Sequence, residues 1–171
     1  MPANLLFPLA LLFPVAMAWA ASSDLLTMRI SNRLVLFLVA SFLVVALVLQ
    51  LPLAQWGSHL GAGALALAIG FTLFAFGWIG GGDAKLAAAT ALWLGFGEGG
   101  LHYLVYSGLL GGLLTLLILA FRNLPLMPIL ARHAWLERLH DPKTGVPYGI
   151  ALAIAGMIVY ANSTIFERLV A

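Results

Sequence analysis

The sequence predicts an all-α, polytopic membrane protein: one bundle of six transmembrane helices with no soluble domain. Its 171 residues are 63% hydrophobic and only 8% charged, and the mean hydropathy of +1.08 lies far above that of an ordinary soluble domain. Most of its apolar runs reach the roughly 17–25 residues that a helix needs to cross the hydrocarbon layer. We therefore expect a single transmembrane domain over residues 1–171, with spans at about 5–21, 34–51, 60–79, 86–97, 101–121 and 147–165.

The first and fourth runs need an argument of their own. Residues 5–21 include Ala-Trp-Ala at 18–20, which imitates the small-residue cleavage site of a secretory signal. No Lys or Arg precedes this run, whereas a signal peptide begins with positive charges, so we predict a retained helix in which Pro8 and Pro14 are tolerated as kinks. The fourth run is short because glycines interrupt it before the fifth run begins.

The basic residues predict the orientation in the membrane. Six spans place the connections after the first, third and fifth spans on one face, and these connections hold seven of the eight Lys and Arg residues. By the positive-inside rule this face is cytoplasmic, and both termini lie outside. Asp24 follows the first predicted span and Asp83 follows the third. Both carboxylates are therefore expected on the cytoplasmic side.

Composition also limits the chemistry. The absence of cysteine excludes disulfides, thiolate catalysis and cysteine-ligated zinc. The four histidines lie apart in the sequence, without the spacing of a metal site, so we expect neither a metal nor a cofactor. The membrane topology accounts for the positive loops, and no nucleic acid is expected as a partner. The partner that composition predicts is the lipid bilayer.

The stretch GWIGGGDAK, residues 77–85, places three glycines and a carboxylate directly after an apolar run. An aspartate at a span end can simply cap a helix by accepting unpaired backbone N–H groups, and this role stays open for Asp24 and Asp83. A plain helix start does not need three glycines, whereas glycine lets a second backbone approach closely. The glycine run therefore favours a site in which an extended substrate lies beside the acid. The alternative is a flexible turn that allows helices to pack closely.

Two converging carboxylates suit acid and base catalysis. In a partly dry site they do not both ionise readily near neutral pH, because each charge opposes the other. One carboxylate can then take a proton from water while the other donates a proton to a carbonyl, as in aspartic proteases. This chemistry makes Asp24 and Asp83 candidate catalytic residues. Asp141 lies on the same face, but it precedes Pro142 in a polar segment, which predicts a turn role.

Three segments of the sequence resemble those of a known family, and they follow one another along the chain as they do in that family. Gly80-Gly81-Gly82-Asp83 matches the Gly-x-Gly-Asp motif of intramembrane aspartyl proteases, and the following Ala-Lys-Leu is similar to their prepilin peptidase branch (peptidase family A24). The earlier DLLTMRISN, residues 24–32, resembles the first catalytic segment of that branch, with Ser31 where many relatives have proline. The later VPYGIALAIAG, residues 146–156, resembles the Pro-Tyr-Gly segment that opens the last helix. In size and span number the chain resembles the short peptidases of tight-adherence (Flp, type IVb) pili.

The resemblance implies an aspartic endopeptidase that cleaves the leader of type IV (Flp-like) prepilins at the cytoplasmic face of the bacterial inner membrane. The substrate would carry a basic leader before a hydrophobic N-terminal helix, and pilus-assembly machinery would be a further partner. Asp24 and Asp83 would be the catalytic pair. The longer bifunctional relatives also N-methylate the new terminus and carry a cysteine-rich zinc insertion; this chain has no cysteine, so we expect cleavage without N-methylation. Residues expected to support the motif or bind substrate are Gly80, Gly82, Lys85, Asn32, Pro147, Tyr148 and Gly149.

Several alternatives remain open. Lys85 is expected to anchor a helix end at lipid headgroups rather than to tune the two acids, and Asn32 to form an ordinary turn hydrogen bond. Residues 132–143 predict either a short amphipathic interfacial helix or a solvated loop. The alternative function is a non-enzymatic membrane subunit, a channel or pilus-assembly scaffold, whose aspartates line a polar cavity or pair with Arg29 or Lys85. A peptidase acting on another membrane-anchored substrate is the nearer alternative.

Overall fold

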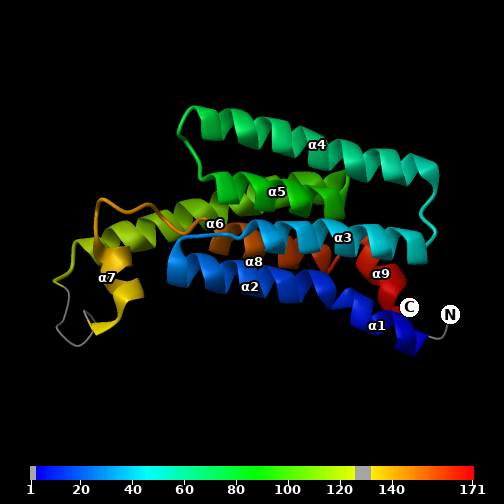
Figure 1. Ribbon diagram of the computed structural model, residues 1–171, viewed down its shortest axis with the longest axis horizontal. Coiled ribbons are helices and arrows are strands. Elements are labelled where there is room, and N and C mark those ends of the chain that lie inside the picture. Colours follow the sequence, from blue (N-terminus) through cyan, green and yellow to red (C-terminus); the bar gives the residue numbers. More distant parts are fainter. Residues whose placement is uncertain (1–2, 126–131) are drawn as a thin grey trace.

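The computed structural model describes residues 3–125 and 132–171, and within these ranges every regular element is a helix (Figure 1). Residues 1–2 and 126–131, which the predicted domain includes, lie outside the described residues. The all-α prediction is confirmed for the described part of the chain. The helices are α1 (Ala3–Ala10), α2 (Leu12–Thr27), α3 (Asn32–Val48), α4 (Leu53–Ala75), α5 (Gly81–Leu94), α6 (Glu98–Arg122), α7 (Ala134–His140), α8 (Gly149–Tyr160) and α9 (Thr164–Val170).

Three helical stretches are long and apolar enough to cross a membrane: Leu6–Thr27 through α1 and α2, then α4, and then α6. Helices α8 and α9 are bent by 59° at their break and provide a fourth stretch if they act as one span. Helix α3 is apolar but has 17 residues, and α5 has only 14. The membrane protein class agrees with these helices, whereas the count of six spans stays a prediction.

The structure corrects several predicted spans. The third, predicted at 60–79, is α4 at Leu53–Ala75, and the sixth, predicted at 147–165, is interrupted between Tyr160 and Thr164.

Two further corrections concern the aspartates. The first helical stretch does not end at residue 21 but continues to Thr27, where Met28 adopts a left-handed conformation with φ of 54°. Asp24 therefore lies within α2 and not after it. Helix α5 begins at Gly81, five residues before the predicted start at 86, because the chain leaves its extended conformation at Gly80. Asp83 thus lies in the first turn of a helix.

The prolines of the first stretch are accommodated by a break. Helix α1 contains Pro8 and ends at Ala10, and α2 starts at Leu12. Pro14 then falls in the first turn of α2, where a backbone N–H has no helical partner and its loss costs little. Of the two alternatives left open for residues 132–143, a short helix is present, α7.

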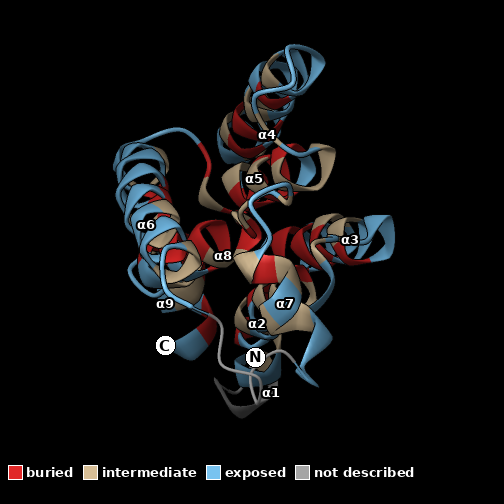
Figure 2. Cartoon of the chain, turned by 90° about the vertical axis from the view of Figure 1, so that its left-hand side faces the viewer, coloured by how far each residue is buried: buried red, intermediate tan, exposed pale blue. Residues whose placement is uncertain are grey.

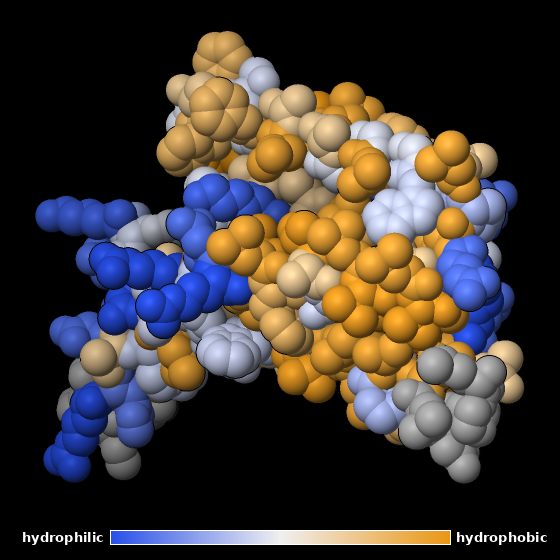
Figure 3. All heavy atoms as spheres, turned by 45° about the vertical axis from the view of Figure 1, so that its right-hand side comes forward, coloured by the Kyte–Doolittle hydropathy of each residue, from blue (hydrophilic) through white to orange (hydrophobic). Residues whose placement is uncertain are grey.

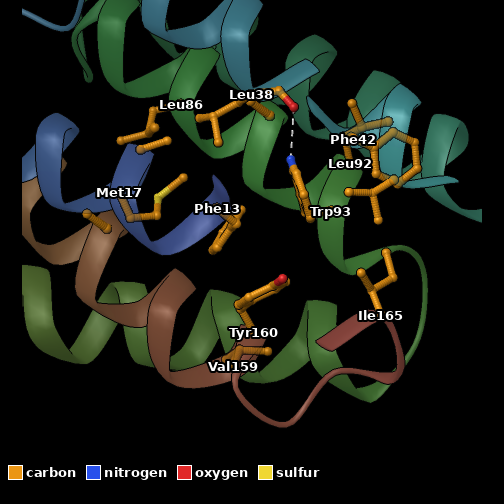
Figure 4. Close-up of a cluster of buried hydrophobic side chains, with 14 of the residues drawn as sticks. Phe13, Met17, Leu38, Phe42, Leu86, Leu92, Trp93, Val159, Tyr160 and Ile165 are labelled. Atoms are coloured by element: carbon orange, nitrogen blue, oxygen red, sulfur yellow. Dashed lines mark hydrogen bonds between the residues drawn. The ribbon is translucent and has the colours of Figure 1, made fainter. Parts of the chain in front are cut away.

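Aromatic side chains form the centre of the core. Phe13, Trp93 and Tyr160 are buried and lie against one another, with ring centroids 4.6–5.7 Å apart. The Trp93 Nε1–H donates to the Leu38 carbonyl at 3.0 Å (Figure 4). The Tyr160 hydroxyl donates to the Ala10 carbonyl at 3.1 Å. These bonds satisfy the polar atoms of the aromatic core and join α5 to α3 and α8 to α1.

Helices α4 and α5 form a closely packed hairpin. A Cβ atom at Gly63 would lie 3.1 Å from the Leu92 Cβ, and one at Gly70 would lie 3.0 Å from the Ala84 Cβ. Small residues therefore allow the two helices to approach. Viewed from the α7 end, α4 and α6 stand apart, with α5 between them (Figure 2).

The two ends of the bundle differ in composition from its middle. Figure 3 shows hydrophilic residues gathered at both ends, most of them at the α7 end, and a broad hydrophobic band between them. The C-terminal ends of α2, α4 and α6 and the N-terminal ends of α3, α5 and α8 lie toward α7, and both chain termini lie at the other end (Figure 1). Asp24 and Asp83 are thus at the same end of the bundle, as the alternation of spans predicts.

Candidate functional site

A polar pocket of about 520 Å³ lies where the end of α2, the connection to α3 and the start of α5 meet. Asp24 and Asp83 both line it, so the structure brings together the two acids that the sequence singles out. Gly80 and Gly82 line the same pocket. The full lining is Ser23, Asp24, Thr27, Met28, Arg29, Ile30, Ser31, Gly80, Gly81, Gly82 and Asp83.

Asp24 is positioned by a bond to another helix. It lies in the last turn of α2, is 5% exposed, and its Oδ2 accepts a hydrogen bond from the Gly149 backbone N–H at 2.7 Å. Gly149 is the first residue of α8, where N–H groups lack helical partners and the helix dipole favours a negative charge. Because Asp24 lies inside α2, it does not cap a helix that begins with its own segment. It instead caps α8.

Asp83 has different neighbours from those of Asp24. It lies in the first turn of α5, where the backbone N–H of Gly80, the residue just before the helix, stabilises the charged carboxylate. Burial, and then the negative charge of Asp24, raise the pKa of Asp83 to about 7, although the Gly80 N–H opposes this rise. Asp83 consequently keeps its proton in a large part of the molecules at neutral pH. This is the electrostatic coupling expected of two carboxylates in one site.

The glycines of the Gly-x-Gly-Asp motif allow neighbouring groups to lie close to the backbone. Gly80 has an ordinary extended conformation, with φ of −71° and ψ of 143°. A Cβ atom there would lie 2.8 Å from the Asp83 Oδ2, and one at Gly82 would lie 3.2 Å from the Ile30 Cβ. Side chains at these positions would displace the acid or the connection between α2 and α3. Close packing at this turn is therefore confirmed, while the approach of a substrate to the glycines stays a prediction.

The Pro-Tyr-Gly segment lies behind the acids and does not line the pocket. Pro147 is fully buried, and the Tyr148 hydroxyl donates to the Ser107 carbonyl of α6 at 3.0 Å. The Tyr148 ring fills the space where a side chain at Gly111 would be. A Cβ atom at Gly149 would lie 2.8 Å from the Asp24 Oδ2. The segment therefore fixes the start of α8 and, through it, the Asp24 carboxylate.

Lys85 and Asn32 bind each other. The Lys85 Nζ donates to the Asn32 Oδ1 at 3.0 Å, which joins α5 to the start of α3. Both residues are exposed, and neither is among the residues that line the pocket. The expected turn hydrogen bond of Asn32 is replaced by this bond between helices. The expected placement of Lys85 at lipid headgroups stays a prediction.

Sequence reasoning missed two hydroxyl residues in the pocket wall. The Ser23 Oγ donates to the Arg29 carbonyl at 2.7 Å, and the Thr27 Oγ1 reaches the same carbonyl at 3.4 Å. They hold the connection after α2 against the pocket. The available signal was the i,i+4 spacing of Ser23 and Thr27, which places the two hydroxyls on one face of a helix beside Asp24.

Asp141, the third acid considered, belongs to a separate turn. It is exposed, and its Oδ1 accepts the Lys143 backbone N–H at 2.9 Å. This agrees with the predicted turn role. It does not line the pocket that holds the other two acids. Across the described ranges, no group of three or more His, Asp or Glu residues is arranged to hold a metal ion.

Comparison with protein families relates the chain to a known one. The model of the type IV leader peptidase family matches residues 11–120, which is more than half of the chain. The matched part contains Asp24, Asp83 and the glycines between Trp78 and Asp83, whereas the Pro-Tyr-Gly segment follows it. No curated protein and no solved structure matches the chain.

Proposed function

The chain belongs to the type IV leader peptidase family, and from this membership we propose that it is an aspartic endopeptidase acting on type IV (Flp-like) prepilins. The substrate leader would be removed at the cytoplasmic face of the bacterial inner membrane. The observation that carries the proposal is that Asp24 and Asp83 line one polar pocket, where the charge of Asp24 acts on Asp83. Family membership supports a peptidase over the non-enzymatic subunit.

The pocket supports a mechanism with one proton shared by two carboxylates. The ionised carboxylate takes a proton from water, and the water oxygen attacks the scissile carbonyl carbon. The protonated carboxyl donates its proton to the carbonyl oxygen, and a tetrahedral diol forms. When this diol collapses, the C–N bond breaks, one product leaves as a carboxylic acid and the other as an amine that has received a proton. A pKa of about 7 at Asp83 fits a pair of carboxylates that holds one proton near neutral pH.

Two features support the finer parts of the proposal. The pocket lies at the end of the bundle toward α7 (Figure 1), where the sequence concentrates Lys and Arg, and a positive face is cytoplasmic in membrane proteins. The lack of cysteine in the sequence argues against the zinc insertion of bifunctional relatives and supports cleavage without N-methylation.

The hydrogen bond between Asp24 and the Gly149 N–H is a contact that a purely structural aspartate also explains. Tests of this site therefore need two separate readouts, the amount of protein in the membrane and the rate of cleavage. A structural aspartate affects the first, and a catalytic aspartate affects the second at constant amount.

The function is tested by incubating membranes that contain the protein with an Flp-type prepilin and analysing the products by mass spectrometry. We expect one cut between the basic leader and the hydrophobic helix, with a free, unmethylated N-terminus on the product. An intact prepilin after incubation would contradict the proposed substrate. A methylated product would contradict only the absence of N-methylation.

The rate of cleavage should fall as the pH rises through about 7. Asp83 has a raised pKa of about 7, so it holds its proton below this pH and loses it above, which leaves two carboxylates and no proton donor. The measurement is kcat/KM for prepilin between about pH 6 and pH 9. The Asp141→Asn protein serves as the control and should show the same alkaline decline. A rate that is constant over this range would contradict the need for a proton shared by the two aspartates.

A further inference from the structure

A second pocket, of about 550 Å³, lies at the end of the bundle away from the aspartates. Residues of α4, of the connection between α5 and α6, of α6 itself and of the region where α8 meets α9 line it. The end of α5, the start of α6 and the end of α8 all lie at the end of the bundle that also holds the two chain termini (Figure 1). We call this cavity the His59 pocket.

His59 lines this pocket with one ring nitrogen bonded and the other without a partner. The residue is 8% exposed, and its Nδ1 lies 2.8 Å from the Leu92 carbonyl oxygen. A carbonyl oxygen only accepts hydrogen bonds, so Nδ1 carries the proton and, in the neutral ring, Nε2 has an unshared electron pair. Among the residues that the structure describes, none forms a hydrogen bond with Nε2. A ligand in the pocket can supply the missing donor.

The orientation of the His59 ring is fixed by its surroundings. The Phe42 ring packs against it, with ring centroids 5.1 Å apart. On another side lies Gly95, which has a left-handed φ of 71°, and a Cβ atom there would be 3.1 Å from the His59 Cε1. The bond to Leu92 prevents rotation of the ring. The unpaired nitrogen is therefore held in one position before any ligand binds.

The electrostatics of the His59 pocket favour a positive ligand. Glu98 is the one acidic residue in its lining, and none of the described residues that line it is Lys or Arg. The C-terminal ends of α5 and α8, which carry partial negative charge, reach the pocket through Leu94 and Val159. The start of α6 carries the opposite partial charge, but Glu98 lies in its first turn and offsets it.

Aromatic and apolar side chains complete the pocket. The rings of His102 and Tyr106 are stacked with centroids 6.0 Å apart, and the face of a tyrosine ring attracts cations. Three of the lining residues, Phe96, Tyr106 and Ile158, are large and exposed. The hydrophobic band gives way to hydrophilic residues at both ends of the bundle (Figure 3), which is the level of lipid headgroups in a membrane protein.

We propose that the His59 pocket binds a primary ammonium group, which donates a hydrogen bond to the His59 Nε2 and lies beside the Glu98 carboxylate. An ammonium group combines donors with a positive charge. A quaternary ammonium group has the charge but no N–H donor, and a phosphate has the wrong charge. The exposed apolar residues of the lining favour the headgroup of an aminophospholipid over a free amine as the source. This inference does not depend on the proposed function, because the aspartates lie at the other end of the bundle.

Lipid binding to the full chain tests the ammonium group. Native mass spectrometry of the purified protein in detergent measures affinities for phosphatidylethanolamine, phosphatidylcholine and phosphatidylglycerol with the same acyl chains. We expect phosphatidylethanolamine to bind about 10-fold more tightly than the other two, because only its headgroup donates a charged hydrogen bond. Equal affinities for the three lipids would overturn the proposal. Free ethanolamine separates the two sources: displacement of the lipid shows that the ammonium group suffices, and no displacement shows that the acyl chains are needed.

Removal of the charge tests the carboxylate. Glu98→Gln should weaken the binding of phosphatidylethanolamine by about 2- to 5-fold, since Glu98 is exposed and solvent screens its charge. Glu167→Gln is the matched control, because Glu167 is an exposed glutamate of α9 that does not line the pocket. An equal effect of the two substitutions would contradict the role of Glu98.

Removal of the acceptor tests His59. Asparagine offers an N–H near the place of Nδ1, which keeps a donor for the Leu92 carbonyl, and has no atom at the place of Nε2. His59→Asn should therefore abolish most of the roughly 10-fold preference for phosphatidylethanolamine over phosphatidylcholine. The affinity for phosphatidylcholine serves as the internal reference, because a general loss of structure lowers both affinities. An unchanged preference would overturn the role of His59, and a variant that does not accumulate leaves Glu98→Gln and the lipid series to decide.

Discussion

Asparagine at Asp24 or Asp83 should reduce prepilin cleavage by about 10²- to 10⁴-fold while the protein still accumulates in the membrane. The amide has nearly the same size as the carboxylic acid, so the contacts with Gly149 and Gly80 can largely persist. It can neither take a proton from water nor donate an acidic proton to a carbonyl, and the shared proton is lost. The measurement is the cleavage rate per unit of protein, with the amount determined by immunoblot.

Asp141→Asn is the matched control for this pair. It removes a carboxylate from the same end of the bundle, but its hydrogen bond is confined to a local turn with Lys143. We expect its cleavage rate to equal that of the unaltered protein. Cleavage retained after replacement of either Asp24 or Asp83 would contradict the two-aspartate mechanism, and loss of protein without loss of specific rate would favour a structural role.

Gly149→Ala should lower kcat/KM by about 10²-fold through displacement of a catalytic group. The new Cβ would lie 2.8 Å from the Asp24 Oδ2 and 2.8 Å from the Ile30 Cδ1. Neither atom can stay in place at that distance, so the carboxylate moves and its bond to the Gly149 N–H weakens. The assay is the same cleavage measurement, normalised to the amount of protein.

Gly108→Ala provides the comparison for Gly149→Ala. A Cβ atom at Gly108 would have no atom within 4 Å among the described residues, and alanine within α6 favours the helix. We expect unchanged cleavage from this variant. Equal rates for the two alanine variants would show that the start of α8 does not position Asp24.

Composition was sufficient to predict the class of fold. Hydrophobic runs predicted helices at every place where a long helix occurs, because the membrane demands both apolar surface and internal hydrogen bonding. Their ends were less accurate. Asp24 is polar and was expected to follow its helix, but a bond to the start of α8 lets it lie buried within α2. Such a bond between residues far apart in the chain leaves no trace in local hydropathy.

The site could be predicted in part. The two aspartates and the glycine turn are recognisable because they are unusual in an apolar chain, and alternation of the spans places them at one end. The role of Gly149 as a donor and the bond between Lys85 and Asn32 depend on how helices pack. Periodicity indicates which face of a helix is apolar but not which helix it meets.

The central claim is that Asp24 and Asp83 form one catalytic unit, and a double-mutant cycle tests it most directly. Residual cleavage is measured for Asp24→Asn, Asp83→Asn and the protein carrying both changes, each at a known amount in the membrane. Groups that act as a unit are strongly non-additive, so the double variant should be as slow as the single variants and no slower. If the two losses multiply instead, the aspartates act independently, and the shared-proton mechanism is wrong.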